Sequence, residues 1–105
     1  MRKGILELCV LSIIDKKPAY PSDIIESLKK SELIVVEGTL YPLLARLKNA
    51  ALLHYSWQES NSGPPRKYYH LTDEGQSFLG ELKSTWKTLN EAVNHAIKKT
   101  RATKS

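Results

Sequence analysis

Hydroxyl and cationic side chains gather between residues 39 and 48. Thr39 and Tyr41 carry hydroxyl groups that can donate hydrogen bonds to phosphate oxygens. Arg46 carries a guanidinium that pairs with a guanine edge or a phosphate, and Lys48 is a weaker candidate for a phosphate contact. These residue types indicate contact with a nucleic acid. An ordinary solvated helix face carries the same types, so this segment alone does not separate the two interpretations.

A second cationic group follows in the segment Gly-Pro-Pro-Arg-Lys, residues 63–67. Glycine and proline favour an exposed turn, so we expect Gly63 to open a loop from which Arg66 and Lys67 project. The only carboxylate between Gly38 and Thr72 is Glu59. Projecting cations suit phosphates or the minor groove of DNA, whereas the alternative is a solubilising turn. The two cationic groups together are more specific than either alone.

Three helices are expected to position the first group. Residues 5–14 are apolar almost all round, so this helix must be covered on every side. In so short a chain we expect a second subunit to cover part of it, including Leu8. A second helix follows Pro21 and ends near Lys30, where its apolar face stops.

The third helix is predicted from Glu37 to about Ala51. Its leucines fall at helical spacing, i, i+3, i+4 and i+7: Leu40, Leu43, Leu44 and Leu47. The opposite face carries small residues that let a helix backbone approach DNA closely. Pro42 is expected in the first turn, where a missing N–H leaves no bond unmade.

Residues 52–58 and 67–71 are predicted to form a β-hairpin, because apolar and polar residues alternate from Leu53 to Gln58. Residues 59–66 between them are too many and too rich in glycine and proline for a tight turn. We therefore expect a long loop that projects into solvent.

The last helix is expected to begin at Thr72, a good cap, and to continue to about Lys99. Apolar residues follow a 3-4-3-4-3 spacing, which is a heptad seam and predicts packing on a symmetric partner. The predicted dimer interface comprises Leu8, Leu79, Leu82, Trp86, Leu89 and Val93. The chain thus divides into residues 1–71, a DNA-binding domain, and residues 72–105, a dimerisation helix with a basic tail.

The fold class that follows is mainly α with a small β-hairpin. Three short helices, a two-stranded wing and a long helix form a winged helix-turn-helix with a C-terminal dimerisation helix. The formal net charge of +5 agrees with a polyanionic partner.

Other classes of protein are disfavoured. The three histidines and the single Cys9 lack the spacing of a metal site, and no nucleophile motif or phosphate-binding glycine loop is present. We therefore expect no enzyme activity, no metal and no cofactor. No apolar stretch approaches the length of a membrane span, and we expect a cytoplasmic protein in which Cys9 packs in the core.

Two segments carry a resemblance to a known family. Residues 37–47, Glu-Gly-Thr-Leu-Tyr-Pro-Leu-Leu-Ala-Arg-Leu, resemble the recognition helix of the PadR family of transcriptional regulators. Residues 66–75, Arg-Lys-Tyr-Tyr-His-Leu-Thr-Asp-Glu-Gly, resemble the same family's wing strand and its entry into the last helix. The resemblance implies a homodimer, usually a repressor, that binds an inverted-repeat operator. It also implies the short subgroup with a single dimerisation helix.

The resemblance assigns DNA-facing positions residue by residue. On the recognition helix these are Thr39, Tyr41, Pro42 and Arg46, and on the wing they are Arg66 and Lys67. Ser22 and Lys48 are weaker candidates for phosphate contact. The sequence departs from the family pattern at Pro65, where many members have a basic residue, and at Glu59, an acid near the wing.

Trp86 has two interpretations. Some multidrug-sensing PadR members are similar here, with a tryptophan that stacks flat aromatic ligands between subunits. Trp86 would then bind a small aromatic effector with Phe78, Leu82 and Leu89. The favoured alternative is a tryptophan that fills the dimer core.

A protein-interaction adaptor is the rival function, because winged helices also serve in that role. Such a domain does not need cations on the recognition helix and on the wing together. Loss of DNA affinity and a flatter salt dependence after substitution of Arg46, Arg66 and Lys67 would distinguish the regulator from the adaptor.

Overall fold

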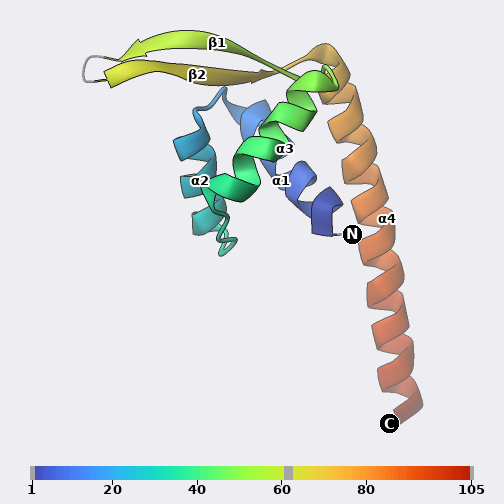
Figure 1. Cartoon of the computed structure of the whole chain (residues 1–105). Helices are drawn as coiled ribbons and strands as arrows, with labels where there is room; N and C mark the ends of the chain where they lie inside the picture. Colours follow the sequence, from blue (N-terminus) through green and yellow to red (C-terminus); the bar gives the residue numbers. More distant parts are fainter. Residues whose placement is uncertain (1, 61–62, 105) are drawn as a thin grey trace.

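The computed structural model describes the backbone of residues 2–60 and 63–104 and the side chains of residues 4–59 and 63–98. Its elements are, in chain order, α1 (Arg2–Lys16), α2 (Pro21–Lys30), α3 (Glu37–Asn49), β1 (Leu53–Ser60), β2 (Gly63–Leu71) and α4 (Asp73–Lys104). The predicted fold class is confirmed: the chain is mainly helical, with one antiparallel hairpin and a long last helix (Figure 1).

The core lies where α1, α2 and α3 meet beneath the base of the hairpin (Figure 1). Val10, Leu11 and Ile14 of α1 are fully or almost fully buried there. The four leucines predicted to form the stripe of α3 are all buried against them. The stripe fixes which face of α3 turns inward, and therefore which face remains for a partner.

Both short helices α2 and α3 end in the same left-handed turn. Glu32 and Ala51 have φ of 63°, a region that favours glycine. At α3 the Leu52 N–H donates to the Leu47 carbonyl and the Ala51 N–H to the Lys48 carbonyl, at 3.0 Å each. This Schellman pattern turns the chain sharply from α3 into β1, and so positions the hairpin beside α3.

The hairpin is longer than the sequence predicted. The prediction of a loop over residues 59–66 is wrong for residues 59–60 and 63–66, because β1 continues to Ser60 and β2 already begins at Gly63. Prolines fit there since β2 is an edge strand, where a missing N–H breaks few ladder bonds. The register shifts between Gln58 and Ser60, which accommodates the extra residue. Asn61 and Ser62, also part of the expected loop, lie outside the described residues.

Pro42 also differs from its prediction. Because α3 begins at Glu37, Pro42 lies in the second turn, inside the helix. It leaves the carbonyl of Gly38 without its usual amide partner. Pro42 and Gly38 are both exposed, so water can satisfy that carbonyl, and the buried leucines on the opposite face hold the helix together.

Backbone pairing fixes the hairpin to the helices. Ala19, between α1 and α2, exchanges two backbone hydrogen bonds with Tyr69 of β2, at 3.1 and 2.8 Å. The connector thus acts as a one-residue third strand. It holds the wing beside the start of α2.

Thr72 caps α4, as predicted. Its Oγ1 accepts a hydrogen bond from the Gly75 N–H at 2.9 Å and donates one to the Ala51 carbonyl at 2.6 Å. A Cβ on Gly75 would lie 2.1 Å from the Leu52 carbonyl oxygen. Only glycine therefore allows α4 to start this close to the turn that leaves α3.

The first part of α4 packs on α1, and the rest extends away from the body (Figure 1). The longest dimension of the chain is accordingly 62 Å against 27 and 21 Å for the other two. The expected basic tail falls on side chains from residue 99 onward, which lie outside the described side chains. Within the described part of the chain, no helix combines the length and the apolarity that crossing a membrane requires.

Candidate nucleic-acid interface

The exposed face of α3 presents small residues in its centre and polar residues on two flanks. Tyr41 and Lys48 lie on the flank toward the hairpin, where the Lys48 ammonium is 5.9 Å from the centre of the Tyr55 ring. Thr39 and Arg46 lie on the opposite flank, toward α1. Nothing lies within 4 Å of the Cβ position on Gly38, so a groove can approach the backbone there.

Arg46 already has a partner within the chain. Its Nη2 donates to Oε1 of Glu7 in α1 at 2.6 Å, with the Arg46 side chain 50% exposed and that of Glu7 19% exposed. Glu7 continues the inward face of α1 beyond Val10, so this ion pair closes the core at its edge. The charge of Arg46 is therefore partly compensated within the chain, which the sequence did not indicate.

The two wing cations are held by aromatic rings on opposite faces of the hairpin. The Lys67 ammonium lies 4.6 Å from the centre of the Tyr55 ring and 5.6 Å from that of Trp57. The Arg66 guanidinium stacks 3.9 Å above the ring of Tyr20.

Arg66 is also tied to the start of α2. Its Nη2 donates to Oγ of Ser22 at 2.6 Å. Nothing in the pattern of residues pointed to Tyr20, because a connector tyrosine shows its role only when the wing folds back over it. Pro21 at the first position of α2 fixes the backbone that presents Ser22.

A cleft of about 360 Å³ joins these elements. Ser22, Tyr41, Arg66 and Lys67, all predicted DNA-facing residues, line it, and they come from α2, α3 and the wing. The lining also includes residues that the sequence did not assign to DNA contact, namely Pro21, Trp57, Pro65 and Tyr69. Thr39 and Arg46 do not line it. The cleft carries two cations and no carboxylate, so it is suited to a polyanion.

The histidines of the hairpin form a local stack. The rings of His54 and His70 are 4.9 Å apart and nearly parallel, and Nε2 of His70 lies 3.3 Å from Oγ of Ser56. Within residues 4–59 and 63–98, no three potential ligands come close enough to hold a metal ion.

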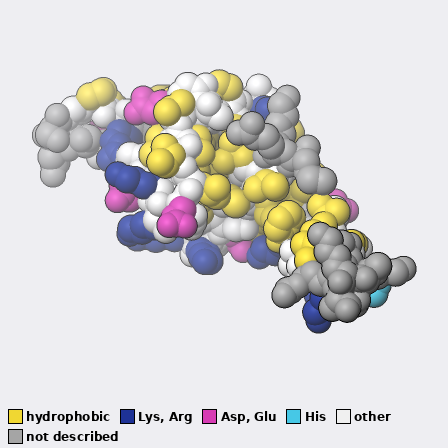
Figure 2. Space-filling model, turned by 90° about the horizontal axis from the view of Figure 1, so that it is seen from below, with side chains coloured by type: hydrophobic (Ala, Val, Ile, Leu, Met, Phe, Trp, Pro, Cys, Tyr) yellow, Lys and Arg dark blue, Asp and Glu magenta, His cyan; other side chains and the backbone are white. Residues whose placement is uncertain are grey.

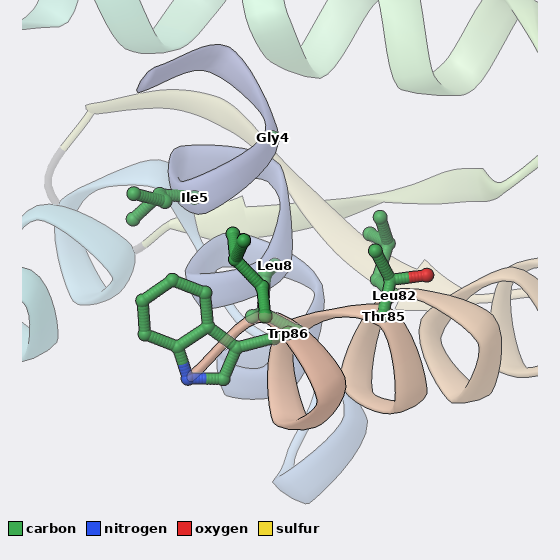
Figure 3. A pocket seen from close by; sticks show the side chains of 7 residues that line it. Gly4, Ile5, Leu8, Leu82, Thr85 and Trp86 are labelled. Carbon is green, nitrogen blue, oxygen red and sulfur yellow. The ribbon is translucent and has the colours of Figure 1, made fainter. Parts of the chain in front are cut away.

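A separate apolar hollow of about 140 Å³ lies between α1 and α4. Figure 3 shows Trp86 of α4 next to Leu8 of α1, with Ile5 on the other side of the hollow. The remaining lining residues are Gly4, Leu82, Thr85 and Leu89. Leu8, Leu82, Trp86 and Leu89 thus meet at one place within the single chain. Their roles in a dimer core or a ligand site stay predictions.

Two other residues assigned to this region lie elsewhere. Leu79 is only 2% exposed and belongs to the core of the single chain, and Phe78 packs against that core without lining the hollow. The first turns of α4 use the seam to pack on the body of the chain, and Leu82 is still half-buried against that core, so the seam becomes exposed only from Trp86 onward. Val93 lies further along α4 and is exposed.

The apolar surface extends beyond the hollow. Figure 2 shows hydrophobic side chains gathered between the helical body and the end of α4. Large apolar side chains are exposed before α3, at Leu33, Ile34 and Val36, and on α4, at Trp86, Val93 and Ile97. Surfaces of this kind usually mark an interface.

Cys9 packs against the core, as predicted. Burial raises the pKa of its thiol, because the thiolate is poorly solvated there. The thiol therefore stays protonated at neutral pH and is a poor nucleophile.

The sequence matches a family model and several solved structures. The model is that of the transcriptional regulator PadR-like family, which matches residues 10–81. A PadR-like transcription factor from Bacteroides fragilis is 66% identical, with a TM-score of 0.82 over 90% of this chain and 92% of that one.

More distant relatives agree. A PadR-like transcriptional regulator from Bacillus cereus is 38% identical, with a TM-score of 0.80 over 92% of this chain and 95% of the other. A curated protein from Lysinibacillus sphaericus, described only as uncharacterized, is 26% identical over 88% of this chain and 87% of its own length.

Proposed function

The chain belongs to the PadR-like family of transcriptional regulators, and from this membership we propose that it is a homodimeric repressor that binds an inverted-repeat operator. The family consists of DNA-binding regulators and not of enzymes. We place its action in the cytoplasm, where the DNA of a bacterial cell lies.

The single observation that carries this proposal is the shared cleft. Three elements far apart in the sequence bring Ser22, Tyr41, Arg66 and Lys67 together in this cleft, beside the exposed face of α3. This arrangement suits a recognition helix in the major groove and a wing over the neighbouring backbone. Phosphate contacts from Arg66 and Lys67 would fix the register, and the face centred on Pro42 would approach the bases.

Dimerisation through α4 supports the inverted repeat. A two-fold dimer presents two recognition helices to two half-sites related by the same symmetry. The seam beyond Leu79, with the exposed Trp86 and Val93 and the half-buried Leu82 and Leu89, would supply the apolar surface for this contact together with Leu8. Leu79 is excluded from the proposed interface because its own chain buries it.

A small aromatic effector is the finer part of the proposal. The hollow beside Trp86 is apolar, and a partner subunit would close it from the open side. A planar compound stacked on the indole would quench its emission. If such a compound is an effector, quenching of the Trp86 emission should be accompanied by weaker DNA binding. If no planar aromatic or phenolic compound changes the emission or the DNA affinity, Trp86 is part of the dimer core instead.

The test of DNA binding is fluorescence anisotropy with a labelled duplex from the region upstream of the protein's own gene. A shuffled duplex of the same composition is the control, and both are measured at two salt concentrations. Tighter binding to the native duplex that persists at the higher salt is the expected result. Absence of binding to either duplex at low salt would instead favour the adaptor function.

A further inference from the structure

Trp57 is the one large apolar side chain of the wing that the structure leaves largely in solvent. Along the inner face of β1, Leu53 is buried, Tyr55 is half-buried and Trp57 is 60% exposed. All three side chains lie on the same face, since alternate residues of a strand point the same way. The strand continues past α3, so α3 covers Tyr55 but not Trp57.

The ring of Trp57 is nevertheless held in a fixed place. Its ring centre lies 5.7 Å from that of Tyr55 in an edge-to-face arrangement. Lys67, its cross-strand partner, places its ammonium 5.6 Å from the indole. An exposed, positioned indole beside a cation is suited to a ligand that is both apolar and anionic.

The cleft identifies the chemistry of that ligand. Trp57 lines it together with Tyr41 of α3 and with Arg66 and Lys67, and no carboxylate lines it. The positive charge disfavours a second copy of this chain as the occupant. The apolar surfaces suited to a second copy lie along α4 instead, at the other side of the body (Figures 1 and 2).

A strand of DNA fits both properties. Adjoining grooves of a duplex are separated by one sugar–phosphate strand, so a helix in the major groove and a wing at the minor groove must pass on either side of it. The deoxyribose rings of that strand are apolar and its phosphates are anionic. Trp57 lies between α3 and the wing tip, where such a strand would run.

We propose that Trp57 packs against the deoxyribose rings of the strand between α3 and the wing, and supplies a part of the DNA affinity that salt does not screen. The inference rests on the proposed DNA binding and extends it to a residue with no charge. Lys67, next to it, supplies the phosphate contact, whose strength depends on salt.

The wild-type chain is first used to select a DNA duplex in vitro from random sequences. The affinities of three variants for this duplex are then compared with that of the wild type. Trp57→Ala is expected to bind about tenfold more weakly at every salt concentration, because the substitution removes apolar contact area and leaves the charge of the protein unchanged. Lys67→Ala is expected to reduce the slope of log affinity against log salt by about one. Gln58→Ala, on the opposite face of the same strand, is the matched control and should bind as the wild type does.

A second measurement guards against a wing that Trp57→Ala has loosened. The chain has two tryptophans, so 5-fluorotryptophan labelling of the otherwise unchanged protein gives two ¹⁹F signals, which Trp57→Phe assigns. Addition of the duplex should shift the Trp57 signal. Wild-type affinity in Trp57→Ala, or a Trp57 signal that DNA leaves unchanged while anisotropy shows binding, would overturn the inference and leave the proposed function intact. A wild-type chain that selects no duplex at all would overturn both.

Discussion

Arg46 shows how one residue can serve the core and the interface together. Its guanidinium pairs with Glu7, whose side chain is mostly buried, while half of the arginine side chain stays exposed. A carboxylate in that position that loses its cation pays the cost of an unpaired, poorly solvated charge. Substitution of Arg46 is therefore expected to change the stability of the fold, in addition to any effect on DNA contact.

Arg46→Ala is expected to lower the free energy of unfolding by about 1–3 kcal/mol, because the Glu7 carboxylate is left unpaired. The double variant Glu7→Gln with Arg46→Ala should recover part of the loss, since no charge is then stranded. Urea denaturation followed by circular dichroism measures both. Lys48→Ala, on the other flank of α3, is the control, and an equal effect of the Lys48 and Arg46 substitutions would contradict a stabilising pair.

Tyr20 positions Arg66 through its ring face and not through its hydroxyl. Tyr20→Leu should weaken binding to the selected duplex by a factor of about 2–5, as expected for loss of an exposed cation–π contact. Tyr20→Phe keeps the ring and should bind as the wild type does. Anisotropy titrations compare the three proteins, and an equal loss in the leucine and phenylalanine variants would assign the effect to the hydroxyl group instead.

The helix ends govern how the elements join. Two helices close with a non-glycine residue in the left-handed region, and α4 carries in its first turn a glycine that nothing larger can replace. These junctions set the angle between α3 and the wing, and hence the width of the cleft. They are also the places where backbone strain is stored.

Ala51→Gly is expected to raise the free energy of unfolding by about 1 kcal/mol, because glycine adopts the left-handed conformation without the Cβ clash. Ala45→Gly makes the same chemical change in the exposed middle of α3, where it should lower the stability by about 1 kcal/mol. Thermal unfolding of the two variants therefore shifts in opposite directions. A destabilised Ala51→Gly would contradict the observed turn.

For the molecule as a whole, the long α4 separates two kinds of surface. The cationic cleft is lined by residues of the wing, α2 and α3, and Trp86, Val93 and Ile97 are exposed along α4. The end of α4 points away from the hairpin (Figure 1). Each proposed partner thus has its own face, so a second subunit and DNA do not compete for the same residues.

Val93→Asp with Ile97→Asp is expected to abolish dimerisation without unfolding the body, since both side chains are exposed in the single chain. Sedimentation velocity should then give a monomer, with helical content retained in circular dichroism. Lys87→Gln with Lys83→Gln, on exposed positions of the same helix, lowers the net charge by the same two units and controls for the change in charge. A fully paired species from the Val93 and Ile97 variant would contradict dimerisation through this surface.

The order and type of the elements followed from the sequence. The leucine spacing of α3, the alternation in the hairpin and the cap at Thr72 are local patterns, and each reports a single element whose period or end it sets. Ser22, Tyr41, Arg66 and Lys67 were assigned from their residue types and from the resemblance to the family, and they meet in one cleft. The predicted contacts of these residues with DNA remain predictions.

The partners of individual side chains were decided only by the tertiary structure. Glu7 meets Arg46 across 39 positions, Arg66 meets Ser22 across 44, and Leu79 enters the core of its own chain when the seam predicted a partner. Trp57 belongs to a regular alternating strand pattern. Its indole is exposed because α3, which covers Tyr55, does not extend far enough to cover Trp57. The period of a sequence fixes which face of an element is apolar. How far the neighbouring element extends over that face depends on packing between segments distant in the chain, which no local pattern contains.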